Sequence, residues 1–157
     1  MNYIFIIYFF RFPNLREIYL NDNEIKTLGP RSFVEMTQLT ALTLEANHLT
    51  QLPDETFQNL HRLQSLNLAR NRIGNLNFNA FDSIGTLAHL CVDLSHNDLK
   101  ALKVNRTTSS SASSTTFLFG GTQSNIMSLD LSFNNISGKN EKSTEGQHSR
   151  TFANSSD

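Results

Sequence analysis

The chain has 157 residues, of which 13 are Lys or Arg and 14 are Asp or Glu, giving a formal net charge of −1. Nucleic acids and anionic membranes attract clustered Lys and Arg, so this balance argues against either as the main partner. The single cysteine, Cys91, excludes an internal disulfide.

Residues 1–14 begin with an apolar run, 1–10, that lacks the basic start of a signal peptide and is followed by no small-residue cleavage site. The run is also too short to span a bilayer, which takes about 20 apolar residues. Its apolar side chains recur in phase 24 residues later: Ile4 with Leu28, Phe9 with Phe33, and Phe12 with Met36. We therefore interpret 1–14 as the second half of a truncated repeat, with a degenerate signal segment as the alternative.

Residues 15–84 hold three copies of one 24-residue unit, in which spaced Leu or Ile residues precede an asparagine and a phenylalanine follows. The copies are Leu15, Ile18, Leu20, Asn23, Ile25, Leu28, Phe33 and Met36; Leu39, Leu42, Leu44, Asn47, Leu49, Leu52, Phe57 and Leu60; and Leu63, Leu66, Leu68, Asn71, Ile73, Leu76, Phe81 and Ile84. Alternation such as Leu42-Thr43-Leu44 predicts a short strand with both leucines on one side. One unit cannot bury its leucines, so the units must stack.

The recurring asparagine follows each predicted strand, where the chain turns and backbone N–H and C=O groups lose their ladder partners. A carboxamide carries two donors and an acceptor, and can satisfy those groups inside the stack. We therefore predict a structural ladder of Asn23, Asn47, Asn71, Asn97 and Asn134. The phenylalanine ten residues after each asparagine is predicted to fill the wider, convex side.

The fourth copy is irregular, because Leu87 and Leu90 are in phase but Asn97 comes two residues late. An insertion of two residues keeps the alternation of a strand, so Leu90, Val92 and Leu94 can all still face inward. A longer or bulged strand accommodates such an insertion.

The fifth copy occupies 126–137, and its Asn134 lies 37 residues after Asn97, an excess of 13 over the period. The excess coincides with a Ser/Thr-rich run at 106–117, which has nothing to bury and predicts a flexible loop on the surface. A tolerated low-complexity expansion is favoured over a functional loop. Residues 138–157 carry one large apolar side chain, Phe152, and are predicted to form a disordered polar tail.

A 24-residue unit that reads N-x-(L/I)-x-x-L and then phenylalanine resembles the "typical" class of the leucine-rich repeat superfamily, over about 4–137. The resemblance implies an α/β-type solenoid of about five repeats at 15–137, curved, with short parallel strands on its concave face and an irregular or short helical convex side. The class is frequent in ectodomains such as those of Toll-like receptors and in Slit and small proteoglycans. Many extracellular members end in cysteine-rich caps, which a single cysteine cannot build.

The missing caps and the in-phase start favour a fragment of a longer protein. We expect an uncapped apolar end, such as the strip 4–12, to favour homodimers or aggregation.

The concave face of such a solenoid is lined by the variable residues that flank the strand leucines. We predict that this face contacts a protein ligand or co-receptor, with aromatic and arginine side chains contributing most of the binding energy. The candidate residues are Tyr19, Asp22, Thr43, Glu45, Asn67, Arg70, Asp93, His96, Asp130 and Phe133. Flanking positions are Glu17, Ala41, Ser65 and Ser128 on one side, and Asn21, Ala69, Ser95 and Ser132 on the other. The alternative is a polar face that is merely solvated.

The sequence contains no motif for catalysis: no glycine-rich phosphate loop, no metal-type His/Cys spacing and no nucleophile motif. We therefore predict no enzyme activity, no cofactor and no metal. Cys91 is interpreted as a small strand residue, since no motif places a histidine or carboxylate to activate its thiol.

Three N-x-S/T sites, at Asn105, Asn135 and Asn154, would be glycan acceptors in a secreted protein. They and the resemblance favour an extracellular or plasma-membrane ectodomain, held to a membrane only through sequence missing from this chain. The predicted function is a non-catalytic protein–protein interaction module of a cell-surface receptor or adhesion protein. The alternatives are a cytoplasmic scaffold or adaptor, and an innate immune recognition ectodomain of Toll-like type.

Overall fold

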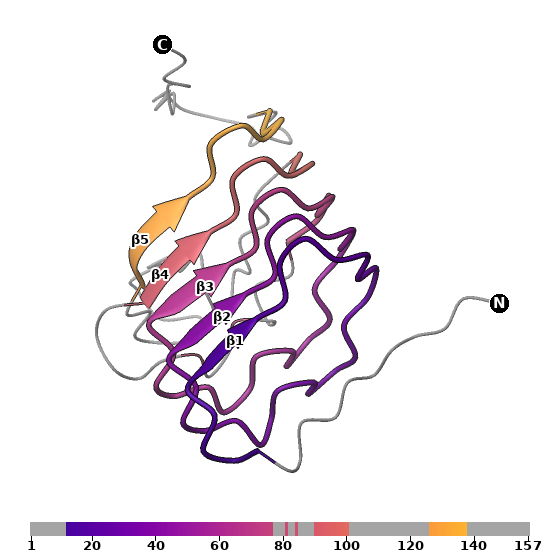
Figure 1. Cartoon of the computed structure of the whole chain (residues 1–157). Helices are drawn as coiled ribbons and strands as arrows, with labels where there is room; N and C mark the ends of the chain where they lie inside the picture. Colours follow the sequence, from indigo (N-terminus) through magenta and orange to yellow (C-terminus); the bar gives the residue numbers. More distant parts are fainter. Residues whose placement is uncertain (1–11, 77–80, 82–83, 85–89, 101–125, 138–157) are drawn as a thin grey trace, which may run out of the picture.

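The computed structural model describes residues 12–76, 81, 84, 90–100 and 126–137. Its strands form one parallel sheet in sequence order (Figure 1). They are β1 (Glu17–Tyr19), β2 (Ala41–Thr43), β3 (Ser65–Asn67), β4 (Leu90–Asp93) and β5 (Ile126–Asp130). One strand per predicted repeat and a parallel order confirm the predicted solenoid.

The register of the sheet shows how the irregular copies are accommodated. Leu66 of β3 pairs with Val92 of β4, so the two-residue insertion is absorbed before β4. Leu90, Val92 and Leu94 are all buried, as strand parity requires. Between β4 and β5 the register shifts after Leu90, and the pairing passes over Met127, which is 69% exposed.

The core lies between the sheet and the return segments, the stretches that connect one strand to the next. Phe33, Phe57 and Phe81 are buried there and form a continuous row, with ring centroids 6.1 and 5.7 Å apart. The described parts of the return segments are turns and irregular backbone, with Phe81 in a 3₁₀ conformation, and contain no α-helix. They agree with the irregular form of the predicted convex side. None of the described residues belongs to a helix long and apolar enough to cross a membrane.

The first described residues continue the backbone pattern of the repeats. The carbonyl of Phe12 accepts the N–H of Leu15 at 3.1 Å, as the carbonyl of Met36 accepts that of Leu39 at 3.0 Å. Phe12 is nevertheless 57% exposed, whereas Met36 is 1% exposed. The rest of the predicted N-terminal segment, the insertion at 106–117 and the tail at 138–157 lie outside the described residues.

Candidate functional site

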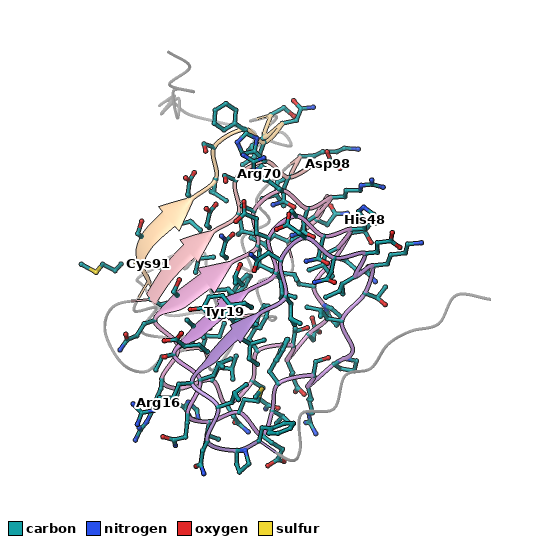
Figure 2. The ribbon with its side chains drawn as sticks, in the orientation of Figure 1. Arg16, Tyr19, His48, Arg70, Cys91 and Asp98 are labelled. Atoms are coloured by element: carbon teal, nitrogen blue, oxygen red, sulfur yellow. The ribbon has the colours of Figure 1, made fainter. Side chains whose placement is uncertain are left out.

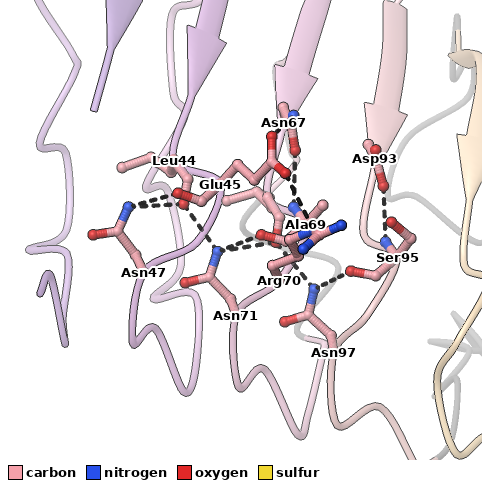
Figure 3. A network of polar contacts seen from close by, with 11 residues as sticks. Leu44, Glu45, Asn47, Asn67, Ala69, Arg70, Asn71, Asp93, Ser95 and Asn97 are labelled. Atoms are coloured by element: carbon pink, nitrogen blue, oxygen red, sulfur yellow. Dashed lines mark hydrogen bonds and ion pairs between the residues drawn. The ribbon is translucent and has the colours of Figure 1, made fainter. Parts of the chain in front are cut away.

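The turn after each strand is held by a ladder asparagine (Figure 3). The Nδ2 of Asn71 donates to the carbonyls of Leu44 at 2.9 Å, Leu68 at 3.0 Å and Ala69 at 3.2 Å, and its Oδ1 accepts the N–H of Leu49 at 3.0 Å. The same four bonds are made by Asn47, Asn97 and Asn134. Two of the four reach the preceding repeat, so the ladder fixes the position of each repeat relative to its neighbour.

Asn23 differs from the other ladder residues. Its Nδ2 donates to the carbonyls of Leu20 and Asn21, at 3.1 and 2.9 Å, and both belong to its own repeat. The side chain is exposed, and among the described residues it makes no bond to another repeat. Within the described part of the chain, the predicted ladder role of Asn23 is therefore seen only in its own turn.

The residue before each ladder asparagine has a left-handed backbone that sequence reasoning missed. Its φ is 53–55° at Asp22, Ala46, Arg70, His96 and Phe133, none of which is glycine. Four of these are predicted partner-binding residues, and their side chains thus leave the molecule from the turn and not from a strand. No residue type recurs at this position, so the sequence carried no signal for the left-handed conformation.

The central row of the concave face runs in register across the sheet. It consists of Tyr19, Thr43, Asn67, Asp93 and Asp130. In the last three, a side-chain oxygen accepts the backbone N–H two residues later: Asn67 from Ala69 at 2.9 Å, Asp93 from Ser95 at 2.9 Å, and Asp130 from Ser132 at 2.8 Å. These side chains, predicted only as partner contacts, also stabilise the turn at the end of their strands.

Ionic contacts join several of the predicted contact residues to one another. Glu45 accepts a hydrogen bond from the Nδ2 of Asn67 at 3.0 Å and pairs with the Nε of Arg70 at 3.4 Å (Figure 3). Arg70, one of the predicted contact residues, is therefore already paired. At β1 the hydroxyl of Tyr19 donates to Glu17 at 2.7 Å, and this bond, with the charge of Glu17, raises the pKa of Tyr19.

The β5 end of the face carries an exposed aromatic pair. The rings of His96 and Phe133 stack with centroids 4.2 Å apart and planes 7° apart, and Phe133 is 75% exposed. His96 has an electrostatic effect on Asp130. The backbone N–H and then the side chain of Ser132 lower the pKa of the Asp130 carboxyl; burial opposes this shift, and His96 adds a smaller lowering effect.

Two predicted flanking positions are wrong. Ala69 and Ser95 are only 4% and 7% exposed, so a partner cannot reach them. Cys91, which sequence analysis left out of the face, is an exposed free thiol in register with Ser65 and Ser128. Correcting the register for the two-residue insertion would have placed Cys91 in that row.

Of the predicted glycan acceptors, Asn135 is exposed, and Asn105 and Asn154 lie outside the described residues. The described residues contain no group of three or more His, Cys, Asp or Glu that could hold a metal ion.

Figure 2 shows the side chains of Tyr19 and Arg70 on the strand side of the molecule and those of His48 and Asp98 on turns away from the strands. The arrangement offers a rigid, polar surface for binding.

Comparison with known proteins agrees with the repeat pattern. A family model described as leucine rich repeat matches residues 4–49 and 37–99, and a second model of that description matches 122–139. The chain belongs to the leucine-rich repeat family. Leucine-rich repeat arrays are in general non-catalytic, and the repeats of this chain form a protein-interaction module. The chain is also 48% identical over 61 residues to Chaoptin of Drosophila melanogaster, a match that covers 39% of this chain and 4% of Chaoptin.

Proposed function

We propose that the concave face binds a protein ligand, and that the chain acts within an extracellular or cell-surface leucine-rich repeat receptor or adhesion protein. The supporting observation is the exposure of large side chains on the sheet and on the turn after it, above a core of buried leucines. Tyr19 is 67% exposed and Phe133 is 75% exposed, whereas Leu42 and Leu66, in the strands between these two residues, are each 1% exposed. Exposed aromatic side chains on a fixed backbone are the usual energetic centres of protein interfaces.

Site-specific photo-crosslinking tests which face binds. A photoreactive amino acid at Ser65, exposed in β3, should form an adduct with a defined protein in cells that express the chain. The matched control carries the same amino acid at Glu35, exposed in a return segment, and should give no such adduct. Adducts from position 35 with none from position 65 would contradict the proposal.

The captured partner then allows the face to be tested by substitution. Tyr19→Ala combined with Arg70→Ala should weaken binding about tenfold or more, since aromatic and arginine side chains dominate interface energies. The thermal unfolding midpoint should change little, because both side chains are exposed. Unchanged affinity would exclude this part of the concave face.

The extracellular location is supported by the exposed sequon at Asn135, whose residue follows the ladder asparagine and is not in a strand. An immunoblot of the endogenous protein, with and without an enzyme that removes N-linked glycans, tests it. A band above 17.7 kDa that moves down on treatment is expected. Absence of any shift favours the second candidate function.

That second candidate is an intracellular scaffold or adaptor, and one observation favours it. Cys91 is an exposed free thiol on the concave face. Exposed free thiols are commoner in the reducing cytosol than in oxidising compartments. Both candidates use the concave face and differ only in compartment.

A further inference from the structure

Two carboxylates lie side by side at the β4–β5 end of the concave face. Asp93 and Asp130 are partners in the register of these strands, and neighbouring strands lie about 4.8 Å apart. In each, one oxygen accepts the N–H at the strand end, so both carboxylates are held in the same orientation. Within the described part of the chain, ion pairs form at Arg31–Glu55 and Arg70–Glu45, and none involves this pair of aspartates.

The negative charge of the pair is not required by the turn. Asn67 makes the same bond to the N–H two residues later, at 2.9 Å, with a neutral amide. At β2 and β3, moreover, the carboxylate of Glu45 is matched by Arg70 and by the amide of Asn67. The turn bond therefore does not require the negative charge of the β4–β5 end, and no Lys or Arg of the described residues forms an ion pair with it.

A flat aromatic surface lies beside these carboxylates. His96 and Phe133 directly follow Ser95 and Ser132, whose N–H groups bind the two carboxylates, and their rings stack with centroids 4.2 Å apart. A guanidinium group hydrogen-bonds carboxylates through its fork of N–H donors and stacks on aromatic faces, and both groups are present here. An ammonium group provides the charge without the planar fork, and nucleic acid or anionic lipid would be repelled.

We propose that the β4–β5 end of the concave face, formed by Asp93, Asp130, His96 and Phe133, binds an arginine side chain of a basic segment of a protein partner. The guanidinium bridges the two carboxylates and lies against the stacked rings. This inference rests on the proposed function and narrows the class of partner. It assigns the selective contact to the C-terminal strands, not to the centre of the sheet.

The test measures binding of a fluorescein-labelled peptide, GRGRGR, to the full chain by fluorescence anisotropy. Counterpart peptides carry lysine or glutamine in place of arginine. We expect the arginine peptide to bind most tightly, the lysine peptide less tightly and the glutamine peptide least tightly. Asp93→Asn with Asp130→Asn should weaken binding of GRGRGR about tenfold, since two exposed ion pairs are lost. The amides keep the turn bonds, as Asn67 does, so the variant should fold.

The matched control is Glu17→Gln with Asp22→Asn, which removes the same charge from the β1 end and should change affinity less than about twofold. Equal weakening by both double variants, or no binding of GRGRGR to the native chain at about 1 mM, would overturn the inference.

Titration of the native chain with GRGRGR, followed through the amide NMR shifts, separates the two proposals without any variant. Shifts at β4 and β5 support the inference. Shifts confined to β1–β3 overturn it and leave the concave face as the binding surface. Shifts confined to the return segments contradict both proposals.

Discussion

Two rows of side chains cross the repeats, and they follow different rules. In the inner row the residue is asparagine each time, and Asn47, Asn71, Asn97 and Asn134 make the same four hydrogen bonds. In the outer row, the central row of the concave face, the backbone is equally regular but the residues change from tyrosine to threonine, asparagine and aspartate. Buried backbone groups dictate the inner residue, whereas the outer one meets water, neighbouring side chains and at most one backbone N–H. Recognition can therefore vary in the outer row at a much smaller cost to the fold.

The largest effect should come from the inner row. Asn71→Ala removes four hydrogen bonds and leaves the buried N–H of Leu49 without its acceptor, while the carbonyls of Leu44, Leu68 and Ala69 each keep one other donor. We expect a loss of about 3 kcal/mol in the free energy of unfolding. Asn23→Ala is the matched control, because that side chain is exposed and makes two bonds within its own turn. Its cost should be below about 1 kcal/mol. Chemical denaturation measures both.

Equal losses of stability in the two variants would contradict the proposed difference between Asn71 and Asn23. They would mean that the asparagine acts within its own turn, and that the bonds between repeats add little. A larger loss at Asn71 would show that the ladder stabilises mainly by joining repeats.

The sequence predicts the inner row well because stacking itself sets the period. Leu66 and Asn71 must recur at the same offset in every repeat, or the leucines and turn carbonyls would lose their partners. Strand alternation, by contrast, does not describe the residues after each strand. Ala69 and Ser95, which precede the left-handed residues Arg70 and His96, are buried. Asn21 and Ser132 hold the same position in the first and last described repeats and are exposed, so alternation within one repeat could not predict which positions of this row a partner can reach.

The contacts made by the charged residues of the concave face could not be predicted from the sequence either. Arg70 and Glu45 come from neighbouring repeats but from different positions within the unit, and the repeat pattern gives no rule for that diagonal contact. Likewise, period and spacing place Asp93 and Asp130 next to each other but do not reveal that each also binds a turn N–H.

The same substitution, alanine to glycine, should have opposite effects on stability at two positions, and this difference tests the left-handed turn. Ala46 has a φ of 53°, a conformation that costs any side chain, so Ala46→Gly should stabilise the protein by about 0.5 kcal/mol. Ala41→Gly, in β2, should instead destabilise it by about 0.5 to 1 kcal/mol, because glycine loses more backbone entropy in a strand. Thermal unfolding of both variants gives the comparison. Destabilisation of equal size at both positions would show that the turn carries no strain.

The smallest effect should come from acid titration of the outer row. The folded chain lowers the pKa of Asp130 below its ordinary 3.8, chiefly through the N–H of Ser132. A lowered pKa means that the ionised form is favoured in the folded state. Its stabilisation is therefore present above pH 3.8 and is lost as the pH falls through the folded-state pKa. Solvent screening at this exposed site keeps the contribution below about 0.5 kcal/mol.

Asp130→Asn keeps the turn bond but cannot titrate, as the amide of Asn67 in the equivalent turn illustrates. The native chain should therefore lose its advantage over the variant only in the acid range, when thermal unfolding is followed from neutral pH to about pH 2.5. The inner row has no ionisable group, so Asn71→Ala should be displaced by the same amount at every pH. If the Asp130→Asn curve also ran parallel to the native curve, the outer-row carboxylate would contribute nothing to the turn as a charge, and its ionisation would matter only for a partner.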